Sequence, residues 1–319
     1  MGLRSFMKTL LLLLCLGLLA PTTLPAEVAS PAKKPVAQST IQRPAYSESF
    51  TVDQLRSFAF EALRSAYPDF NFKLVNGKLV FPDGTSLPFD DGLDRSPQAL
   101  LDAPDIFDMF FYRYPSLAQR KGPQATTGTA VHDPNDGALT LPMSLPYLAD
   151  PGRIRNENFF QQMYGSTEEA VKQRLAPVKW IPSGKGPTMM VTTINGVNKA
   201  LQAVSDELDK LPELWPYLLR PGGSFTWRPI AGTNRLSVHS FGAAVDINVE
   251  KSNYWRNVNQ DEEARLDYKN RIPAKIVEVF ERHGFIWGGW WYHYDTMHFE
   301  YRPELIAYMK VVEHARAVK

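Results

Sequence analysis

Two short segments in the C-terminal half carry histidine and carboxylate side chains at spacings suited to metal binding. In the first segment, His239 and Asp246 are separated by small residues that include Gly242. Glycine permits a tight return of the chain. The following residues alternate like a strand, so Asp246 points away from the apolar pair Val245 and Ile247. A histidine and a carboxylate presented in this way can both reach one metal ion.

The second segment contains Asp295, His298 and Glu300. In an extended strand His298 and Glu300 share one face, while Phe299 and Tyr301 take the other. Two imidazoles and one carboxylate would hold a tetrahedral Zn²⁺ with its fourth position open for water, and zinc lowers the pKa of that water to about 7. Asp295 is three residues before His298 and is the predicted general base, because such a base must lie within hydrogen-bond reach of the water.

Other hydrolytic motifs are missing from the sequence. His-Glu-x-x-His and Gly-x-Ser-x-Gly do not occur, which excludes a zincin and the usual serine-hydrolase elbow. Ser-x-x-Lys occurs only at Ser5–Lys8 and Ser30–Lys33, in segments that cannot form an active site. No glycine-rich phosphate loop is visible.

The motif Ser-x-His-x-x-Gly-x-Ala-x-Asp, from Ser237 to Asp246, is followed about fifty residues later by Asp-x-x-His-Phe-Glu. This pattern resembles the M15 family of zinc peptidases, which act on bacterial cell-wall peptides and include D-alanyl-D-alanine carboxypeptidases and L-alanyl-D-glutamate endopeptidases. The resemblance covers roughly residues 150–305. It implies that His239, Asp246 and His298 hold zinc and that Asp295 is the base.

The resemblance also implies an arginine upstream of the first motif that stabilises the polarised carbonyl. Arg228 occupies the matching place, but the family's small-residue lead-in is altered there, so Arg235 is a nearby alternative. Either guanidinium could supply oxyanion donors, worth about 3–4 kcal/mol in comparable sites. Ser237, two residues before His239, is predicted to contact substrate.

Some neighbouring residues allow two interpretations. His293 is an alternative ligand, although a role at the surface or behind a ligand is favoured, and the remaining histidines are expected to be ordinary polar groups. Glu300 either orients a ligand or is a capped carboxylate at the strand end. The eight aromatic residues from Phe285 to Tyr301 line a cleft or pack in the core, and for at least half of them packing is favoured.

Three functions are compatible with these residues. An aspartate base followed by His-Phe-Glu resembles the endopeptidase branch, so hydrolysis of an L-alanyl-D-glutamate bond in peptidoglycan stem peptides is the leading hypothesis. D-alanyl-D-alanine carboxypeptidase activity is the alternative within the family. The alternative from another class is a non-catalytic, zinc-stabilised module that binds the cell wall.

The chain's 319 residues include 35 basic and 34 acidic side chains, a net charge of +1 that argues against a nucleic-acid partner. Residues 1–26 have the basic start, short apolar run and small-residue end of a signal peptide. Export, to the periplasm or to the cell wall as a secreted protein, is therefore expected, without a permanent membrane anchor. Loss of Arg4 and Lys8 leaves a net charge of −1. The segment also contains the only cysteine of the sequence. A single cysteine has no partner within the chain, so a disulfide framework is excluded.

The elements that position these residues predict an α+β fold in which helices flank a small antiparallel sheet that carries the zinc site. Residues 27–45 are expected to form a flexible tether. Residues 46–149 form an N-terminal helical and hairpin region to which the sequence assigns no role, and residues 150–319 form the M15-like domain. Residues 97–113 have helical spacing. Ser166 with Glu169 predicts one helix start, and Asn195 predicts another. The sequence makes no prediction about oligomeric state.

Overall fold

A computed structural model describes residues 49–115, 148–230, 232–257 and 268–319. The predicted signal peptide, the tether 27–45 and His132 lie outside the described residues. Within these ranges, no helix is both long enough and apolar enough to cross a membrane.

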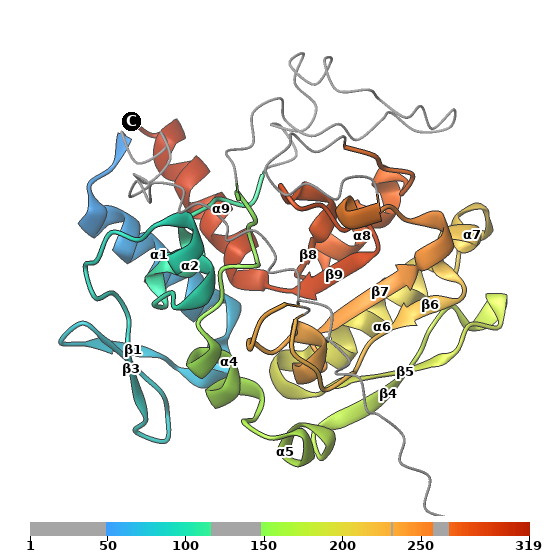
Figure 1. Ribbon diagram of the computed structural model, residues 1–319, viewed down its shortest axis with the longest axis horizontal. Coiled ribbons are helices and arrows are strands. Elements are labelled where there is room, and N and C mark those ends of the chain that lie inside the picture. The colour runs from blue at the N-terminus through green and yellow to red at the C-terminus, as the bar shows by residue number, and fades with distance from the viewer. Residues whose placement is uncertain (1–48, 116–147, 231, 258–267) are drawn as a thin grey trace, which may run out of the picture. The chain divides into compact units, whose positions relative to one another are not determined.

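Short helices and antiparallel strands alternate along the described chain (Figure 1), so the predicted α+β class is confirmed. The helices are α1 Val52–Ala66, α2 Pro97–Asp102, α4 Glu157–Tyr164, α5 Glu168–Lys172, α6 Val197–Leu208, α7 Trp215–Leu218, α8 Ala274–Arg282 and α9 Pro303–Ala317. The strands are β1 Lys73–Val75, β2 Lys78–Val80, β3 Ser86–Pro88, β4 Leu175–Lys179, β5 Thr188–Thr192, β6 Pro221–Gly223, β7 Ala244–Asn248, β8 Phe285–Trp287 and β9 His298–Tyr301.

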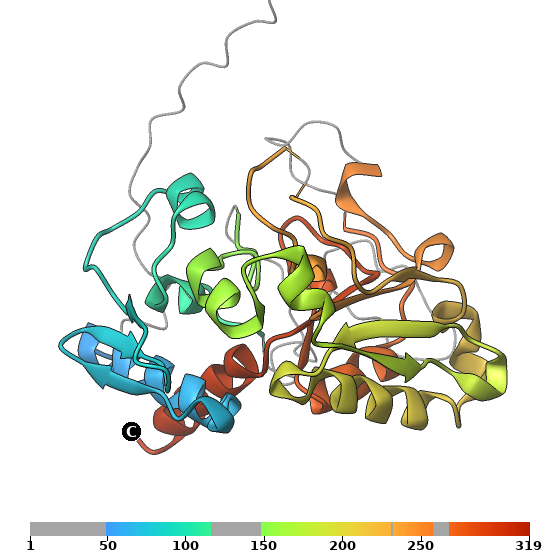
Figure 2. The ribbon, with the colours of Figure 1, turned by 90° about the horizontal axis from the view of Figure 1, so that it is seen from below.

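The N-terminal region combines α1 with the three-stranded sheet β1-β2-β3. Thr51 caps α1 in a reciprocal capping box with Gln54, which satisfies two free backbone N–H groups. Asn76 and Gly77 both have positive φ, as the tight hairpin between β1 and β2 requires. Helix α1 packs along the C-terminal helix α9, and Figure 2 shows the two side by side.

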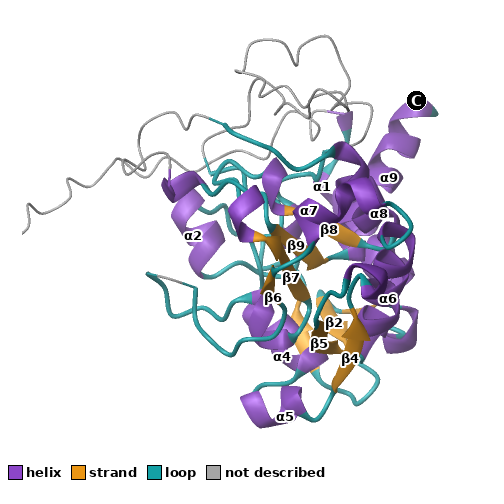
Figure 3. Cartoon of the chain, turned by 90° about the vertical axis from the view of Figure 1, so that its right-hand side faces the viewer, coloured by secondary structure: helices purple, strands orange, loops and turns teal. Residues whose placement is uncertain are grey.

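The C-terminal half is built on a four-stranded antiparallel sheet of order β6-β7-β9-β8. Figure 3 shows α6 and α8 together on one side of these strands. Helix α8 buries one apolar stripe, and its Phe280 stacks on Phe299 of β9 with ring centroids 3.8 Å apart. This packing fixes the apolar face of β9, so the alternate residues of the strand project from its other face.

Buried polar contacts join the N-terminal region to the C-terminal half. The Tyr67 hydroxyl donates to Glu304 at 2.6 Å, and the Tyr114 hydroxyl accepts from the backbone N–H of Trp287 at 2.8 Å. All described residues fall in one compact unit. The boundary near residue 150 stays a prediction about where the M15-like portion begins.

Three local predictions were wrong. The α5 cap is Thr167, whose hydroxyl accepts from Ala170, rather than Ser166. Asn195 has a left-handed backbone and its side chain donates to Tyr164, so α6 starts after Gly196 without that cap. The helical spacing of 97–113 is interrupted after α2 and resumes only as a short 3₁₀ turn, since Pro104 disfavours a helical conformation at the residue before it.

Candidate metal and active site

The turn that carries His239 is the 3₁₀ segment η8, Val238–Phe241. Ser237 caps it by accepting from the His239 backbone N–H at 3.4 Å. Gly242 ends it with φ +64°, and a Cβ there would lie 2.7 Å from Leu175 and 3.0 Å from the Thr192 backbone nitrogen. Glycine is therefore required for both conformation and space, and the turn delivers the chain directly into β7.

Asp246 and His298 meet because of strand register. In the antiparallel pair β7 and β9, Asp246 is directly opposite His298, and opposed side chains on one face lie within contact distance. Val245 and Ile247 are fully buried, while Asp246 keeps about a fifth of its side chain exposed. The predicted alternation of β7 is confirmed.

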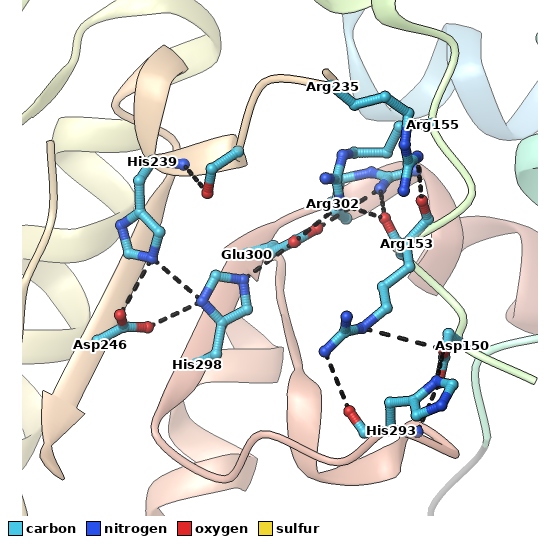
Figure 4. A network of polar contacts seen from close by, with 12 residues as sticks. Asp150, Arg153, Arg155, Arg235, His239, Asp246, His293, His298, Glu300 and Arg302 are labelled. Carbon is cyan, nitrogen blue, oxygen red and sulfur yellow. Dashed lines mark hydrogen bonds and ion pairs between the residues drawn. The ribbon is translucent and has the colours of Figure 1, made fainter. Parts of the chain in front are cut away.

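Three donor atoms converge on one point (Figure 4). His298 Nδ1 lies 2.8 Å from Asp246 Oδ1, and His239 Nε2 lies 3.2 Å from both Asp246 Oδ2 and His298 Nδ1. In a tetrahedral zinc site with bonds of about 2.0–2.1 Å, adjacent ligand atoms are about 3.3 Å apart. The structure thus brings the three predicted ligands together in a group that could hold a metal ion.

The outer nitrogen of each imidazole is already engaged. His239 Nδ1 donates to the Ser224 carbonyl at 2.6 Å, and His298 Nε2 donates to Glu300 at 3.0 Å. Arg155 in turn donates to Glu300 at 3.2 Å. These partners select the tautomers whose inner nitrogens present lone pairs to each other, an arrangement that suits a shared cation. Of the two interpretations of Glu300, the geometry favours the one in which it orients a ligand.

The charges of this group are strongly coupled. Burial alone would raise the pKa of Asp246, but the two histidines beside it hold that pKa well below its usual range. Burial would lower the pKa of His298, yet its hydrogen bonds to Asp246 and Glu300 raise it to about 10. The carboxylates therefore favour a positive charge between the imidazoles, which a proton or a metal ion can supply.

Asp295 lines the same cavity as the three donors. Burial raises its pKa to about 6, although the positive charge of His298 acts in the opposite direction. Its Oδ1 is buried and has no hydrogen-bond partner among the described residues. A carboxylate oxygen left unpaired inside a polar cavity is suited to accept a proton from a bound molecule.

The structure separates the two candidate arginines. Arg228 lines the cavity together with Ser237, and its backbone is fixed by hydrogen bonds with Ser240. Arg235 lines a different pocket and donates to the Arg153 carbonyl at 3.1 Å. Of the two, Arg228 is the one placed to reach a substrate, while the capping bond of Ser237 gives that side chain a local structural role as well.

Residues 150–155 contribute groups that the sequence interpretation missed. Arg153 and Arg155 both line the cavity, and Trp291 lies beneath the Arg153 guanidinium, 4.8 Å from ring centroid to Cζ. His293 is buried and bonds to Asp150 at 2.8 Å, so it is neither at the surface nor in the three-donor group. The available signal was the pair of arginines after Gly152, but nothing in the sequence connects them with residues about 140 positions later.

The aromatic residues between Phe285 and Tyr301 mostly form the core. Trp287, Trp290 and Phe299 are fully buried, whereas Trp291 lines the cavity. Tyr254, from outside this run, also lines it. The preference for packing over a cleft wall therefore agrees with the structure for most of these rings.

The α+β chain brings a His-Asp-His group that could hold a metal ion and a buried carboxylate into one cavity, a combination of groups suited to hydrolytic chemistry. Residues 231–301 match the M15 peptidase family model described as D-alanyl-D-alanine carboxypeptidase. The match includes His239, Asp246, Asp295 and His298, confirms the resemblance to M15 peptidases and supports a peptidase. No curated protein and no solved structure matches the chain.

Proposed function

We propose that this protein is a zinc-dependent peptidase that hydrolyses an amide bond in the stem peptides of peptidoglycan. The observation that carries the proposal is the placement of His239, Asp246 and His298 around one point. Asp295 lines the same cavity, and its Oδ1 has no hydrogen-bond partner among the described residues. When bound, zinc supplies Lewis acidity and a water molecule of lowered pKa.

The protein's own residues would divide the proton transfer and the charge stabilisation. Asp295, with a pKa of about 6, is largely ionised at neutral pH and accepts a proton at Oδ1, which it then passes to the leaving amine. Arg228 projects into the cavity and donates hydrogen bonds to the carbonyl oxygen as negative charge develops there. Glu300 keeps the His298 ring in its orientation throughout.

Two activities known in the family are each supported by a different observation. The aspartate base followed by His-Phe-Glu favours an L-alanyl-D-glutamate endopeptidase, which is our leading assignment. The description of the matching family model favours a D-alanyl-D-alanine carboxypeptidase. Purified peptidoglycan digested with the protein, followed by mass spectrometry of the new termini, separates the two. Free L-alanyl and D-glutamyl termini support the first, and release of D-alanine alone overturns it.

A non-catalytic wall-binding module is the alternative from another class. A purely structural zinc site closes its fourth position with a protein ligand and needs no base. Asp295 Oδ1, by contrast, is buried in the same cavity and has no partner in the part of the chain that the structure describes. Loss of peptidoglycan binding on chelation, with no hydrolysis by the zinc-loaded protein, would favour the module.

We also propose that the protein is exported, as the character of residues 1–26 indicates. The mature chain would start near Glu27 and act in the periplasm or at the cell wall. Intact-mass measurement of protein recovered from the envelope or medium tests this: retention of Met1 would contradict it.

A further inference from the structure

The turn at residues 150–155 places Arg153 in the cavity of the candidate metal group, with only part of its guanidinium engaged in contacts with protein. Arg153 Nη2 donates to the His293 carbonyl at 3.1 Å, and its guanidinium lies over the face of Trp291. Its Nε is buried without a hydrogen-bond partner among the described residues. The planar group is thus held on one face by Trp291 and at Nη2 by the His293 carbonyl (Figure 4), and Nη1 makes no hydrogen bond within the described ranges.

The buried carboxylate of Asp150 supports Arg153 indirectly, through His293, and does not form a hydrogen bond with its guanidinium. Asp150 is fully buried and accepts from both the backbone N–H and Nδ1 of His293, each at 2.8 Å. Its Oδ2 is 4.0 Å from Arg153 Nε, beyond hydrogen-bond distance. The Asp150–His293 pair therefore fixes the carbonyl that Arg153 binds, and it leaves the guanidinium donors available.

The turn itself is rigid by packing. Gly152 has φ +102°, and a Cβ there would come within 2.6 Å of Ile286 and 3.2 Å of Trp291. The carbonyl of Gly152 accepts from both Arg155 and Arg302 at 2.9 Å. Arg153 therefore projects into the cavity from a segment that cannot approach or retreat without breaking buried contacts.

The other arginines that line the cavity differ from Arg153 in burial and in their ion pairs. Arg155 is buried and ion-paired with Glu300 at 3.2 Å, so its charge is used behind His298. Arg228 is exposed and comes from the loop between β6 and η8. With Arg256, four arginines line the cavity against the three carboxylates Asp246, Asp295 and Glu300, which leaves it cationic even before a metal is added. Such a cavity favours an anionic ligand.

We propose that Arg153 forms a carboxylate-binding subsite beside the metal group and recognises a free carboxylate of the peptide substrate next to the bond that is cut. A guanidinium stacked on an indole and with unused donors can bind a carboxylate through parallel hydrogen bonds. The inference rests on the proposed function for the identity of the peptide. In a stem peptide that carboxylate is the α-carboxylate of D-glutamate or that of the terminal D-alanine.

The test uses binding, because binding does not depend on turnover. The probes are the pentapeptide L-alanyl-γ-D-glutamyl-L-lysyl-D-alanyl-D-alanine and two counterparts, one amidated at the D-glutamate α-carboxylate and one at the C-terminus. Titration calorimetry on the zinc-loaded Asp295→Asn chain is compared with the same chain carrying Arg153→Gln. Arg220→Gln is the matched control, since Arg220 pairs with Glu250 at the exposed surface.

One of the two amidations should weaken binding to the Asp295→Asn chain by about 10- to 100-fold, as expected for a lost charged hydrogen bond. Arg153→Gln should abolish that preference and leave zinc content unchanged, whereas Arg220→Gln should preserve it. The amidation that matters identifies the recognised carboxylate. A preference that survives Arg153→Gln, or equal binding of all three peptides, overturns the subsite.

The outcomes also separate this inference from the proposed function. Hydrolysis by the unmodified protein with an unchanged preference in Arg153→Gln removes the subsite and leaves the peptidase. Binding that depends on Arg153 without hydrolysis by the zinc-loaded protein retains the subsite and removes the peptidase. Failure of all three peptides to bind, with no hydrolysis, contradicts both.

Discussion

Two groups of three side chains in the described residues lie close enough to share a metal ion: His239, Asp246 and His298 in the C-terminal half, and Asp90, Asp91 and Asp105 in the N-terminal region. They differ in what their atoms already contact. In the first group each histidine has its outer nitrogen tied to protein, and its inner nitrogen faces the other ligands.

In the second group the carboxylate oxygens are used to build a loop. Asp90 and Asp91 accept from the backbone N–H groups two residues further on, and Asp105 accepts from Asp91 N and Asp108 N. Arg95 pairs with two of these carboxylates, Asp91 and Asp105, and with the neighbouring Asp108. The acidic cluster is thus explained by loop structure. The comparison shows that a candidate metal site is recognised better by ligand atoms that face one another and are free of other contacts than by the closeness of the residues alone.

The largest expected effect is the loss of metal binding. His298→Ala removes one of three proposed ligands. The unmodified protein is expected to retain stoichiometric zinc after dialysis, and the variant should lose both this zinc and all hydrolysis. Asp105→Asn, the matched change in the acidic cluster, should leave zinc content unchanged. Elemental analysis of both purified variants tests the comparison directly, and zinc loss in Asp105→Asn would reverse it.

Asp295→Asn should separate chemistry from metal binding. Without the carboxylate, kcat should fall by about 10²- to 10⁴-fold, the usual contribution of a general base, while zinc content stays at the unmodified level. Single-turnover hydrolysis of the stem pentapeptide, with zinc measured on the same sample, gives both quantities. A variant that retains full kcat would show that Asp295 is not the base.

Glu300→Gln tests the contacts behind the ligands. It keeps the shape but removes the charge that orients His298 and pairs with Arg155. Zinc affinity should fall by about 10- to 100-fold, as is typical when a ligand loses its supporting carboxylate. Competition with a chromogenic chelator measures the affinity. Asp91→Asn is the control, and an equal loss there would indicate general destabilisation.

The sequence anticipated which side chains the structure brings together better than it anticipated the elements around them. The three predicted ligands and Asp295 lie in two short segments. Asp246 and His298 are on the paired strands β7 and β9, and His239 lies in the turn that leads into β7, so local spacing was enough to bring them together. Arg153, Asp150 and Arg155 come from a turn far upstream, and only tertiary packing brings them to the cavity. The cap of α6 was mispredicted because Asn195 bonds to Tyr164 instead, a contact that no local pattern indicates.

The smallest predicted effect concerns pH, and it has opposite signs for Asp105 in the acidic cluster and for Glu300 behind the candidate metal group. Burial, together with the neighbouring charge of Asp108, raises the pKa of Asp105 to about 7, above its value in the unfolded chain. Its contribution to stability is therefore complete below about pH 4 and is lost as the pH rises through 7. The pKa of Glu300 is lowered to about 2, since Arg155 and the hydrogen bond from His298 outweigh burial, so its contribution is present above about pH 4 and is lost only in acid.

Between pH 6 and 8 the unmodified protein should lose about 1 kcal/mol of unfolding free energy relative to Asp105→Asn. Urea unfolding of both proteins at the two pH values measures this difference, and parallel behaviour would mean that Asp105 is ionised throughout, as an exposed loop carboxylate would be.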